Sequence, residues 1–218
     1  MPGIFVTGTD TGVGKTQVSL GLITLLQRQG LTVAAMKPVA SGCELTAAGL
    51  CNEDALLLQA QSSVSLPYEL INPYAFAAAI APHIAAEREQ VVIDIAKIKI
   101  HFNHIQQCAD TVVVEGAGGW LVPINNDQTM ADLAVALDLP IVLVVNIGLG
   151  CINHALLTVA AIQKSGLFLQ GWVANQIEPV KEAEAIIGAL RSRIKANCLG
   201  SIPPMLSEQT TAIYLSLS

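Results

Sequence analysis

A series of almost continuously apolar runs, spaced along the chain, is the feature that most restricts how it can fold. The runs are Ile4–Thr7, Thr32–Lys37, Thr111–Glu115, Ile141–Asn146, Leu169–Asn175 and Cys198–Ile202. A strand that is covered on both faces has this composition, because neither of its faces meets water. The runs therefore predict the strands of a parallel sheet that is buried between two layers of helices.

The stretches between these runs have the length and composition of helices. We expect helices at Lys15–Gln29, Asn52–Gln61, Val91–Gln107, Thr129–Leu137, Ile152–Ser165 and Pro179–Ala196. The chain has 218 residues, of which 52% are hydrophobic. This is enough for the core of a single α/β domain, and we expect one domain over residues 1–218.

Bulk composition excludes several classes of protein. No uninterrupted apolar stretch reaches the ~18 residues of a transmembrane helix, and the N-terminus lacks the pattern of a signal peptide. The net charge is −6, without a large cluster of Lys and Arg, so we expect neither a nucleic acid nor a membrane as partner. The five cysteines are scattered and form no C-x-x-C pair, which predicts free thiols in a reducing cytoplasm.

The turn after the first run, TDTGVGKT at residues 9–16, has the pattern of a phosphate-binding loop. Such a loop joins a strand to a helix, and its backbone N–H groups cradle phosphate oxygens. Lys15 would reach the outer phosphates and Thr16 would ligate magnesium. The strict pattern requires glycine where this chain has Thr9, so we predict a deviant loop. The fold class that follows is a single-domain P-loop NTPase-like α/β fold, with a mostly parallel central sheet flanked by helices.

Other polar residues lie where predicted strands end, and ligands of parallel sheets bind at that edge. Lys37 is either a solvated lysine or a second cation for phosphate. Glu115 has the chemistry of a magnesium ligand, and the alternative interpretation is that it lies at a solvent-exposed strand end. Asp54 is either a further ligand or an acid that favours the dipole of its helix. Asn175 either reads a base edge through its amide or forms a turn.

Two further features carry weaker signals. A glycine-bearing turn, residues 148–154, begins a helix and either holds an anion or is an ordinary connection. His101 and His104 are three residues apart on a predicted helix, but no acid or cysteine accompanies them, so we expect no metal there. His83, after Pro82, either touches a substrate or has no functional role.

Several ordered segments together resemble the dethiobiotin synthetases over essentially the whole chain. The matching segments are FVTGTDTGVGKT (5–16), KPVASG (37–42), N-x-DAL (52–56), NPY-x-F (72–76), PH (82–83), VVEGAGGW (113–120), LGCINHA (149–155) and GWVANQ (171–176). The resemblance implies a homodimeric ligase that depends on ATP and Mg²⁺ and acts in biotin synthesis. It implies 7,8-diaminopelargonic acid and CO₂ as substrates, with a carbamate and a carbamic–phosphoric mixed anhydride as intermediates.

The resemblance also implies roles for residues at matching positions. Catalysis is implied for Lys37, Lys15 and Thr11, and metal binding for Thr16, Asp54 and Glu115. Substrate binding is implied for Ser41 and, from the partner subunit, for Gly150, Cys151 and Asn153. Nucleotide binding is implied for Gly12, Val13, Gly14, Lys15, Thr16, Gln17, Asp54, Glu115, Gly116, Ala117, Gly118, Asn175, Gln176, Pro204, Met205 and Leu206. Some members have glutamate where this chain has Gly12, so no acidic role is assigned there.

The main alternative is a switch ATPase of the partition or cell-division type, which shares the fold and a deviant loop. Such proteins carry a signature lysine where this chain has Asp10, and many end in a basic amphipathic helix that this chain lacks. Amide-forming synthetases need an ammonia source, usually a glutaminase domain for which 218 residues leave no room. A non-catalytic nucleotide-binding module would not explain Lys37 together with Glu115.

Overall fold

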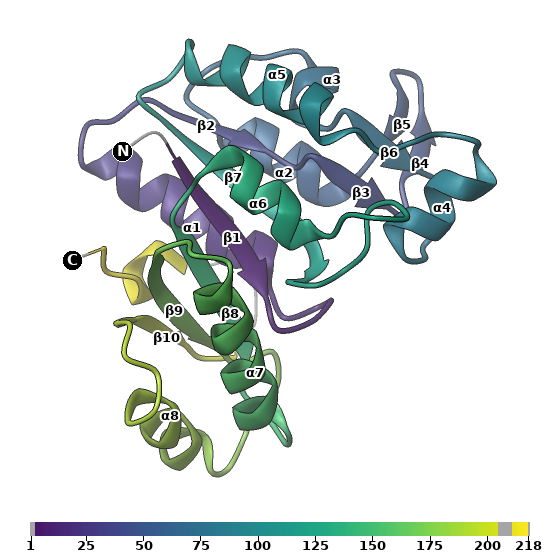
Figure 1. Ribbon diagram of the computed structural model, residues 1–218. Coiled ribbons are helices and arrows are strands. Elements are labelled where there is room, and N and C mark those ends of the chain that lie inside the picture. Colours follow the sequence, from purple (N-terminus) through teal and green to yellow (C-terminus); the bar gives the residue numbers. More distant parts are fainter. Residues whose placement is uncertain (1–2, 205–210, 218) are drawn as a thin grey trace.

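The computed structural model describes residues 3–204 and 211–217, and its centre is one six-stranded sheet (Figure 1). The strands are β1 (Gly3–Gly8), β2 (Val33–Met36), β7 (Thr111–Gly119), β8 (Ile141–Asn146), β9 (Leu169–Asn175) and β10 (Cys198–Ile202). Their order is β10-β9-β8-β1-β7-β2, and all neighbouring pairs are parallel. The predicted fold class is confirmed, and each predicted strand is present.

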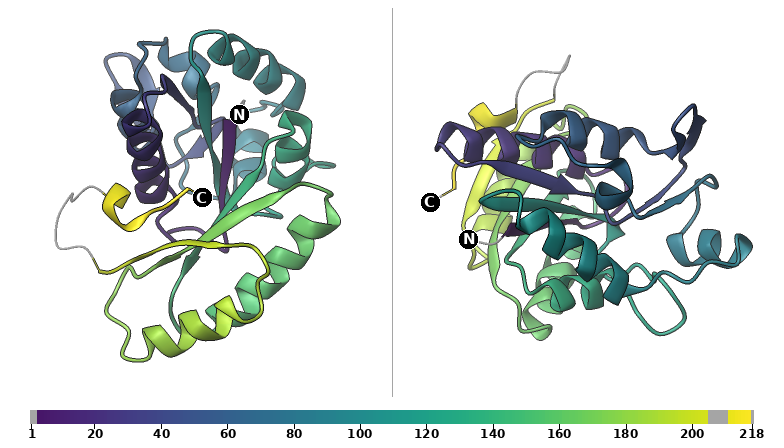
Figure 2. Two further views of the ribbon diagram at one scale, coloured as in Figure 1. Left: turned by 90° about the vertical axis from the view of Figure 1, so that its left-hand side faces the viewer. Right: turned by 90° about the horizontal axis from the view of Figure 1, so that it is seen from above.

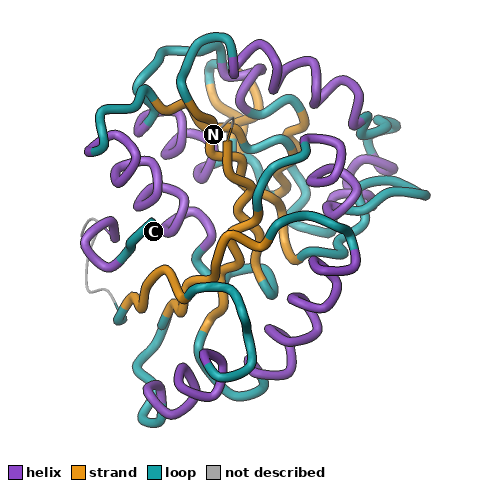
Figure 3. Tube along the Cα trace, turned by 60° about the vertical axis from the view of Figure 1, so that its left-hand side comes forward, coloured by secondary structure: helices purple, strands orange, loops and turns teal. Residues whose placement is uncertain are grey.

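Both faces of the sheet are buried, as the apolar runs predicted. Val113 packs into one core, whereas Val112 and Val114 pack into the other, because successive side chains of a strand point to opposite faces. The first face is covered by α1 (Lys15–Arg28), α2 (Glu53–Gln61) and the 3₁₀ helix η1 (Thr211–Tyr214). The second is covered by α5 (Ile95–Gln106), α6 (Met130–Leu137), α7 (Cys151–Lys164) and α8 (Ala183–Arg191). Figures 2 and 3 show these helical layers on either side of the strands.

The region between β2 and α5 contains short elements that the sequence did not predict. They are β3 (Val39–Ser41), β4 (Glu44–Thr46), β5 (Gly49–Cys51), α3 (Tyr68–Ile71), β6 (Tyr74–Phe76) and α4 (Pro82–Arg88). β3 and β6 form a parallel pair, and β4 and β5 form an antiparallel hairpin. Each of these strands has three residues, which is too short for a period of two to be recognised.

Several predicted boundaries were wrong. The helix predicted from Val91 begins at Ile95, because the Asp94 carboxylate accepts a hydrogen bond from Ala96 N and caps it. The helix predicted over 179–196 is confined to Ala183–Arg191. β7 continues past Glu115 to Gly119, which pairs with Gly8 of β1 after an irregularity at which Gly118 has a positive φ of 61°.

The topology brings the ends of β1, β2 and β7 to one edge of the sheet. β1 lies between β8 and β7, and β2 is the next strand beyond β7. Residues that follow these strands are far apart in sequence but adjacent in space. Within residues 3–204 and 211–217, no helix is long and apolar enough to cross a membrane.

Candidate functional site

The phosphate loop connects β1 to α1, as predicted. Gly14 is the N-cap of α1 and has a left-handed backbone with φ 87°. A Cβ atom at Gly14 would lie 2.1 Å from Nδ2 of Asn175, so both the backbone and the packing require glycine. No side chain caps α1, so its first N–H groups are left for a ligand, and a helix N-terminus favours an anion.

Lys15 lies at the start of α1 and is almost completely buried. Its Nζ donates a hydrogen bond to the Asp10 carbonyl oxygen, at 2.9 Å, across the loop. Burial, followed by the nearby Lys37 ammonium, lowers the pKa of Lys15 to about 8. The loop therefore holds a partly desolvated cation that an anionic ligand would stabilise.

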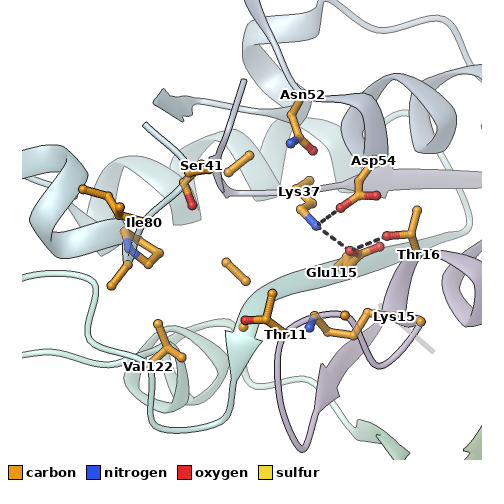
Figure 4. Close-up of a pocket in the computed structure, with 18 of the residues that line it drawn as sticks. Thr11, Lys15, Thr16, Lys37, Ser41, Asn52, Asp54, Ile80, Glu115 and Val122 are labelled. Carbon is orange, nitrogen blue, oxygen red and sulfur yellow. Dashed lines mark hydrogen bonds and ion pairs between the residues drawn. The ribbon is translucent and has the colours of Figure 1, made fainter. Parts of the chain in front are cut away.

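A second buried cation lies between two carboxylates (Figure 4). Lys37 follows β2, and its Nζ donates to Asp54 Oδ2 at 2.8 Å and to Glu115 Oε1 at 2.5 Å. Glu115 comes from β7 and Asp54 from the first turn of α2, which Asn52 caps by accepting a bond from Ala55 N. The predicted residues Lys37, Asp54 and Glu115 thus converge from three elements that the sequence separates widely.

The two charges of the Lys37–Asp54 ion pair stabilise each other. Burial alone would lower the pKa of Lys37, but the Glu115 and Asp54 carboxylates outweigh it and raise that pKa above its ordinary value. Burial alone would raise the pKa of Asp54, but Lys37 outweighs it and lowers that pKa. The ammonium and this carboxylate therefore both stay charged at neutral pH.

The residues predicted to bind metal lie close together, and their oxygen atoms are of the kind that Mg²⁺ prefers. The Thr16 hydroxyl donates to Glu115 Oε1 at 2.9 Å, so these two predicted ligands are adjacent. Glu115 is fully buried, and its Oε2 has no hydrogen-bond partner among the described residues. The described part of the chain has no group of three or more His, Cys, Asp or Glu that could hold a metal. One or two carboxylates and a hydroxyl suit Mg²⁺, which takes its remaining ligands from phosphate and water.

A cavity of about 720 Å³ opens in front of these groups. The predicted site residues that line it are Thr11, Gly12, Gly14, Lys15, Thr16, Gln17, Lys37, Ser41, Asp54, Glu115, Ala117 and Gly118. Of the other predicted loop and β7 residues, Val13 is buried in the core, and Gly116 lies behind the site against Phe5 and Met130.

The same cavity has lining residues to which sequence reasoning gave no role. They are Ala40, Asn52, Ala79, Ile80, Ala81, Pro82 and Val122. Asn52 and Pro82 belong to segments that match the family, so the resemblance could have identified them as candidate site residues. Val122 and Ile80 carried none, because an isolated apolar residue in a loop has no pattern.

Asn175 connects β9 to the phosphate loop. Its Nδ2 donates to the Val13 carbonyl oxygen at 2.9 Å, while its buried Oδ1 has no partner within the described part of the chain. Gln176 follows it and donates its backbone N–H to Ile202 O at the end of β10. Pro204 lies just beyond β10 and is half-buried, whereas Met205 and Leu206 lie outside the described residues.

The second glycine-bearing turn is not part of the cavity. Gly150 is the N-cap of α7 with φ 86°, Cys151 is buried and Asn153 is exposed. None of the three lines the cavity. His83 borders a separate cavity. Among the described residues, the His101 ring forms a hydrogen bond with the Glu69 carbonyl oxygen and none with an acidic side chain.

Curated relatives match the whole length of the chain. It is 50% identical to the ATP-dependent dethiobiotin synthetase BioD of Pseudomonas aeruginosa strain UCBPP-PA14, over 97% of this chain and 93% of that protein. It is 49% identical to the same synthetase of Cellvibrio japonicus, over 98% of this chain and 95% of that one. This chain belongs to the ATP-dependent dethiobiotin synthetase family. The predicted resemblance is thereby confirmed.

Further comparisons agree with a dethiobiotin synthetase built on a nucleotide-binding fold. A family model described as an AAA domain matches residues 2–210. Among solved structures, the cell division ATPase MinD of Pyrococcus furiosus is 17% identical, with a TM-score of 0.57 over 94% of this chain and 84% of that one. The MinC:MinD complex of Aquifex aeolicus gives a TM-score of 0.56 at 18% identity, over 93% and 81% of the two chains. At this identity the likeness concerns the fold alone.

Proposed function

We propose that this protein is an ATP- and Mg²⁺-dependent cyclo-ligase that forms the ureido ring of dethiobiotin. Its substrates would be 7,8-diaminopelargonic acid and CO₂, with ATP as co-substrate. Membership of the dethiobiotin synthetase family supports the overall reaction. The cavity supports a reaction between a phosphate chain and a small second substrate, because the phosphate loop and Ser41 border the same space.

The proposed chemistry has three steps. One amine of the diamine attacks CO₂, loses a proton and becomes a carbamate. A carbamate oxygen attacks the γ-phosphorus of ATP, the bond to the bridging oxygen breaks, and ADP leaves a carbamic–phosphoric mixed anhydride. The second amine attacks the carbonyl carbon and loses a proton, while the C–O bond to phosphate breaks. The products are the cyclic urea, ADP and inorganic phosphate.

Lys15 and Lys37 would supply the positive charge that phosphoryl transfer requires. Charge neutralisation and in-line positioning account for most of the catalysis in such reactions. Lys15 would bind the outer phosphates, and Lys37 lines the same cavity as the loop and Ser41 (Figure 4). Thr11, in the phosphate loop, and Ser41, at the end of β3, both line this space and would position the carbamate.

Thr16, Asp54 and Glu115 would hold Mg²⁺ together with phosphate oxygens. When bound, this ion would supply positive charge that neutralises the phosphates of ATP. The buried, unpaired Oε2 of Glu115 supports this assignment. Its other oxygen already accepts bonds from Lys37 and Thr16, which fixes the direction of the carboxylate.

The adenine would bind near the ends of β9 and β10. The unpaired Asn175 Oδ1 could accept a hydrogen bond from an exocyclic amine, while the Nδ2 of the same amide stays on the loop. Gln176 and Pro204 lie at the same edge of the sheet. We extend the proposal to Met205 and Leu206, which follow Pro204 in the chain.

We further propose that the protein is a homodimer in which Gly150, Cys151 and Asn153 bind the distant carboxylate of the partner's substrate. Apolar side chains near this turn support a protein interface, since Leu149 is fully exposed and Leu121 and Leu157 are each more than half exposed. Leu121 and Leu157 line one surface cleft together with Asp10 of the phosphate loop.

We also propose that the protein acts in the cytoplasm, since a reducing compartment suits its five free cysteines.

The observation that carries the proposal is the buried Lys37, which faces two carboxylates and the phosphate loop in one cavity. A nucleotide switch needs no such cation beside a second binding space. The position of the signature lysine of those ATPases is held here by Asp10, whose carboxylate accepts a hydrogen bond from Thr11 N.

The decisive test is turnover with 7,8-diaminopelargonic acid, bicarbonate, ATP and Mg²⁺, following ADP and the cyclic urea together by mass spectrometry. We expect equal amounts of both products, and neither product when the diamine is omitted. ATP hydrolysis that is indifferent to the diamine would refute the ligase and support the switch ATPase.

A further inference from the structure

The main chain of Lys37 is held by a segment that does not belong to the central sheet. Lys37 lies just beyond β2, so its main-chain N–H and C=O groups are not hydrogen-bonded to a neighbouring strand of the described sheet. Its N–H donates to Ile71 O at 2.9 Å, and its carbonyl oxygen accepts from Asn72 Nδ2 at 2.6 Å. Both contacts come from the end of α3. The base of the Lys37 side chain is therefore fixed by residues that lie outside the central sheet.

The same segment also holds the N-terminus of α2. The Tyr68 hydroxyl donates to Asn72 Oδ1 at 2.9 Å and accepts from the backbone N–H of Asn52 at 2.7 Å. Asn52 is the N-cap of α2, and Asp54 lies in the first turn of that helix. The position of the Asp54 carboxylate thus depends on where Tyr68 holds this helix end.

These bonds close into a ring. It runs from the Lys37 carbonyl through Asn72 and Tyr68 to Asn52, along the α2 terminus to Asp54, and back through the Asp54–Lys37 ion pair. Asn72 is buried, and neither Asn72 nor Tyr68 lines the cavity. The ring joins the two elements that carry opposite charges in the site, and Tyr68 and Asn72 are the members that lie outside the space where substrates would bind.

We propose that Tyr68 and Asn72 are positioning residues that fix the Lys37 ammonium relative to Asp54 for phosphoryl transfer. This inference rests on the proposed function, since it takes Lys37 as a cation of that reaction. Misplacing a reacting or stabilising group by about 1 Å costs a large factor in rate, so a scaffold that fixes both partners has a direct effect on turnover. Burial raises the pKa of the Tyr68 phenol, which keeps the hydroxyl protonated and able to donate at neutral pH.

The chain offers a matched control for removing the Tyr68 hydroxyl. The Tyr74 hydroxyl likewise accepts from one backbone N–H, that of Asp94 at 3.0 Å, and burial raises the pKa of this phenol too. That bond holds the start of α5, not the site. Tyr68→Phe and Tyr74→Phe therefore delete the same atom and one comparable main-chain hydrogen bond, but only the first deletion opens the ring.

The test compares kcat, KM and thermal stability of the two variants, assayed well below their melting temperatures. We expect both melting temperatures to fall by a few degrees, and that of Tyr68→Phe to fall further, because this variant also loses the bond to Asn72 Oδ1. We expect Tyr68→Phe to lower kcat by roughly tenfold with KM for ATP and diamine nearly unchanged, and Tyr74→Phe to leave kcat at the wild-type value. Equal kcat values for the two variants would overturn the inference.

A double variant separates positioning of Lys37 from any other effect. In the Lys37→Ala background, Tyr68→Phe should lower kcat by much less than its roughly tenfold effect in the wild type, because the ammonium that it fixes relative to Asp54 is gone. A full, additive loss would show that Tyr68 acts independently of Lys37 and would overturn the inference. If Lys37→Ala alone left turnover intact, the proposed role of Lys37 would fail instead, so the two failures are distinguishable.

Discussion

The two glycine turns of this protein have nearly the same local geometry and very different surroundings. Gly14 caps α1 with φ 87°, and Gly150 caps α7 with φ 86°, after the neighbouring strands β1 and β8. A Cβ at Gly14 would collide with Asn175, whereas the nearest atom to one at Gly150 is His154 Cε1 at 4.0 Å. The first turn lies against Lys37, Asp54 and Glu115, whereas the second faces outward beside the fully exposed Leu149.

This contrast teaches that a left-handed glycine at a helix N-terminus supplies only free N–H groups, and that the neighbouring elements decide what they can bind. The first turn is completed within one chain by groups from β2, α2 and β7. Among the described residues, the cavity that contains Lys37, Asp54 and Glu115 does not include the second turn, which agrees with the proposal that this turn acts on the substrate of a partner subunit. Each of the following predictions alters one turn or its surroundings.

The largest effect is expected from removing the cation that sets the first turn apart. Lys37→Ala should leave ATP binding largely intact but lower kcat by ~10²–10³, the scale for losing one partner of transition-state charge. Steady-state kinetics together with calorimetric titration of ATP would measure both quantities. Near-normal turnover would remove Lys37 from the mechanism.

The next effect concerns the glycine of the first turn. Gly14→Ala places a Cβ on the Asn175 amide and forces a left-handed backbone on alanine, a combined penalty of about 3 kcal/mol. We expect ATP affinity to fall by roughly a hundredfold, as titration calorimetry would measure. Gly150→Ala is the matched control and should leave ATP affinity unchanged. Equal losses in the two variants would contradict the difference between the turns.

A third prediction concerns the second turn in the assembled enzyme. Asn153→Ala should raise KM for the diamine by about tenfold, the effect of losing one hydrogen bond to a charged group. At a diamine concentration well below the wild-type KM, Asn153→Ala alone should keep about a tenth of wild-type activity, whereas dimers formed by mixing equal amounts of Asn153→Ala and Lys37→Ala subunits should regain roughly a quarter. Half of the dimers are then mixed, and each has one site with an intact Lys37 and an intact partner turn. A mixture no more active than its components would mean that the turn acts within its own subunit.

A fourth prediction uses the pKa of about 8 of Lys15 in the first turn. The ammonium that attracts phosphate is present below this pH and lost above it, so ATP affinity should fall by roughly tenfold between pH 7 and pH 9. At pH 9, binding should take up a proton, which calorimetry in two buffers of different ionisation enthalpy detects. Lys15→Arg, whose side chain stays charged, should show a flat profile. A flat profile for the wild type would contradict the assignment.

The smallest effect is on stability. Gly150→Ala meets no steric neighbour, so it should cost only the left-handed strain of about 1 kcal/mol. Urea unfolding of the variant and the wild type would measure this difference in the free energy of unfolding. A loss of several kcal/mol would show that the second turn is packed more tightly than its surroundings indicate.

The sequence predicted the sheet and much of the site because both have strong local patterns. Continuous apolar runs such as Ile141–Asn146 fit only buried strands, and the loop at 9–16 has a fixed spacing. Lys37 and Glu115 could be predicted for the site because each ends a recognisable apolar run, whereas the role of Asp54 followed from the family resemblance. Placement of Gly150 and Asn153 in a shared site still stays a prediction.

The remaining features depend on tertiary contacts that leave no periodic pattern. The Asn175 bond to Val13 joins residues that are distant in sequence, and nothing local to either announces it. The ring through Tyr68 and Asn72 runs across α3, which has four residues and no amphipathic signal. The short strands β3, β4, β5 and β6 of the same region were not predicted either, because three residues are too few to show a pattern.

The strand order β8-β1-β7-β2 also has a consequence for how the chain folds. Parallel pairing of strands far apart in sequence closes long loops, so the central sheet forms slowly and late. The nucleotide site needs β1, β2, α2 and β7 together, so no partly folded intermediate can bind ATP well. Binding only the native state, the nucleotide should raise the melting temperature and slow proteolysis as its concentration increases. Cellular ATP would thus set the lifetime of the folded chain as well as its rate of turnover.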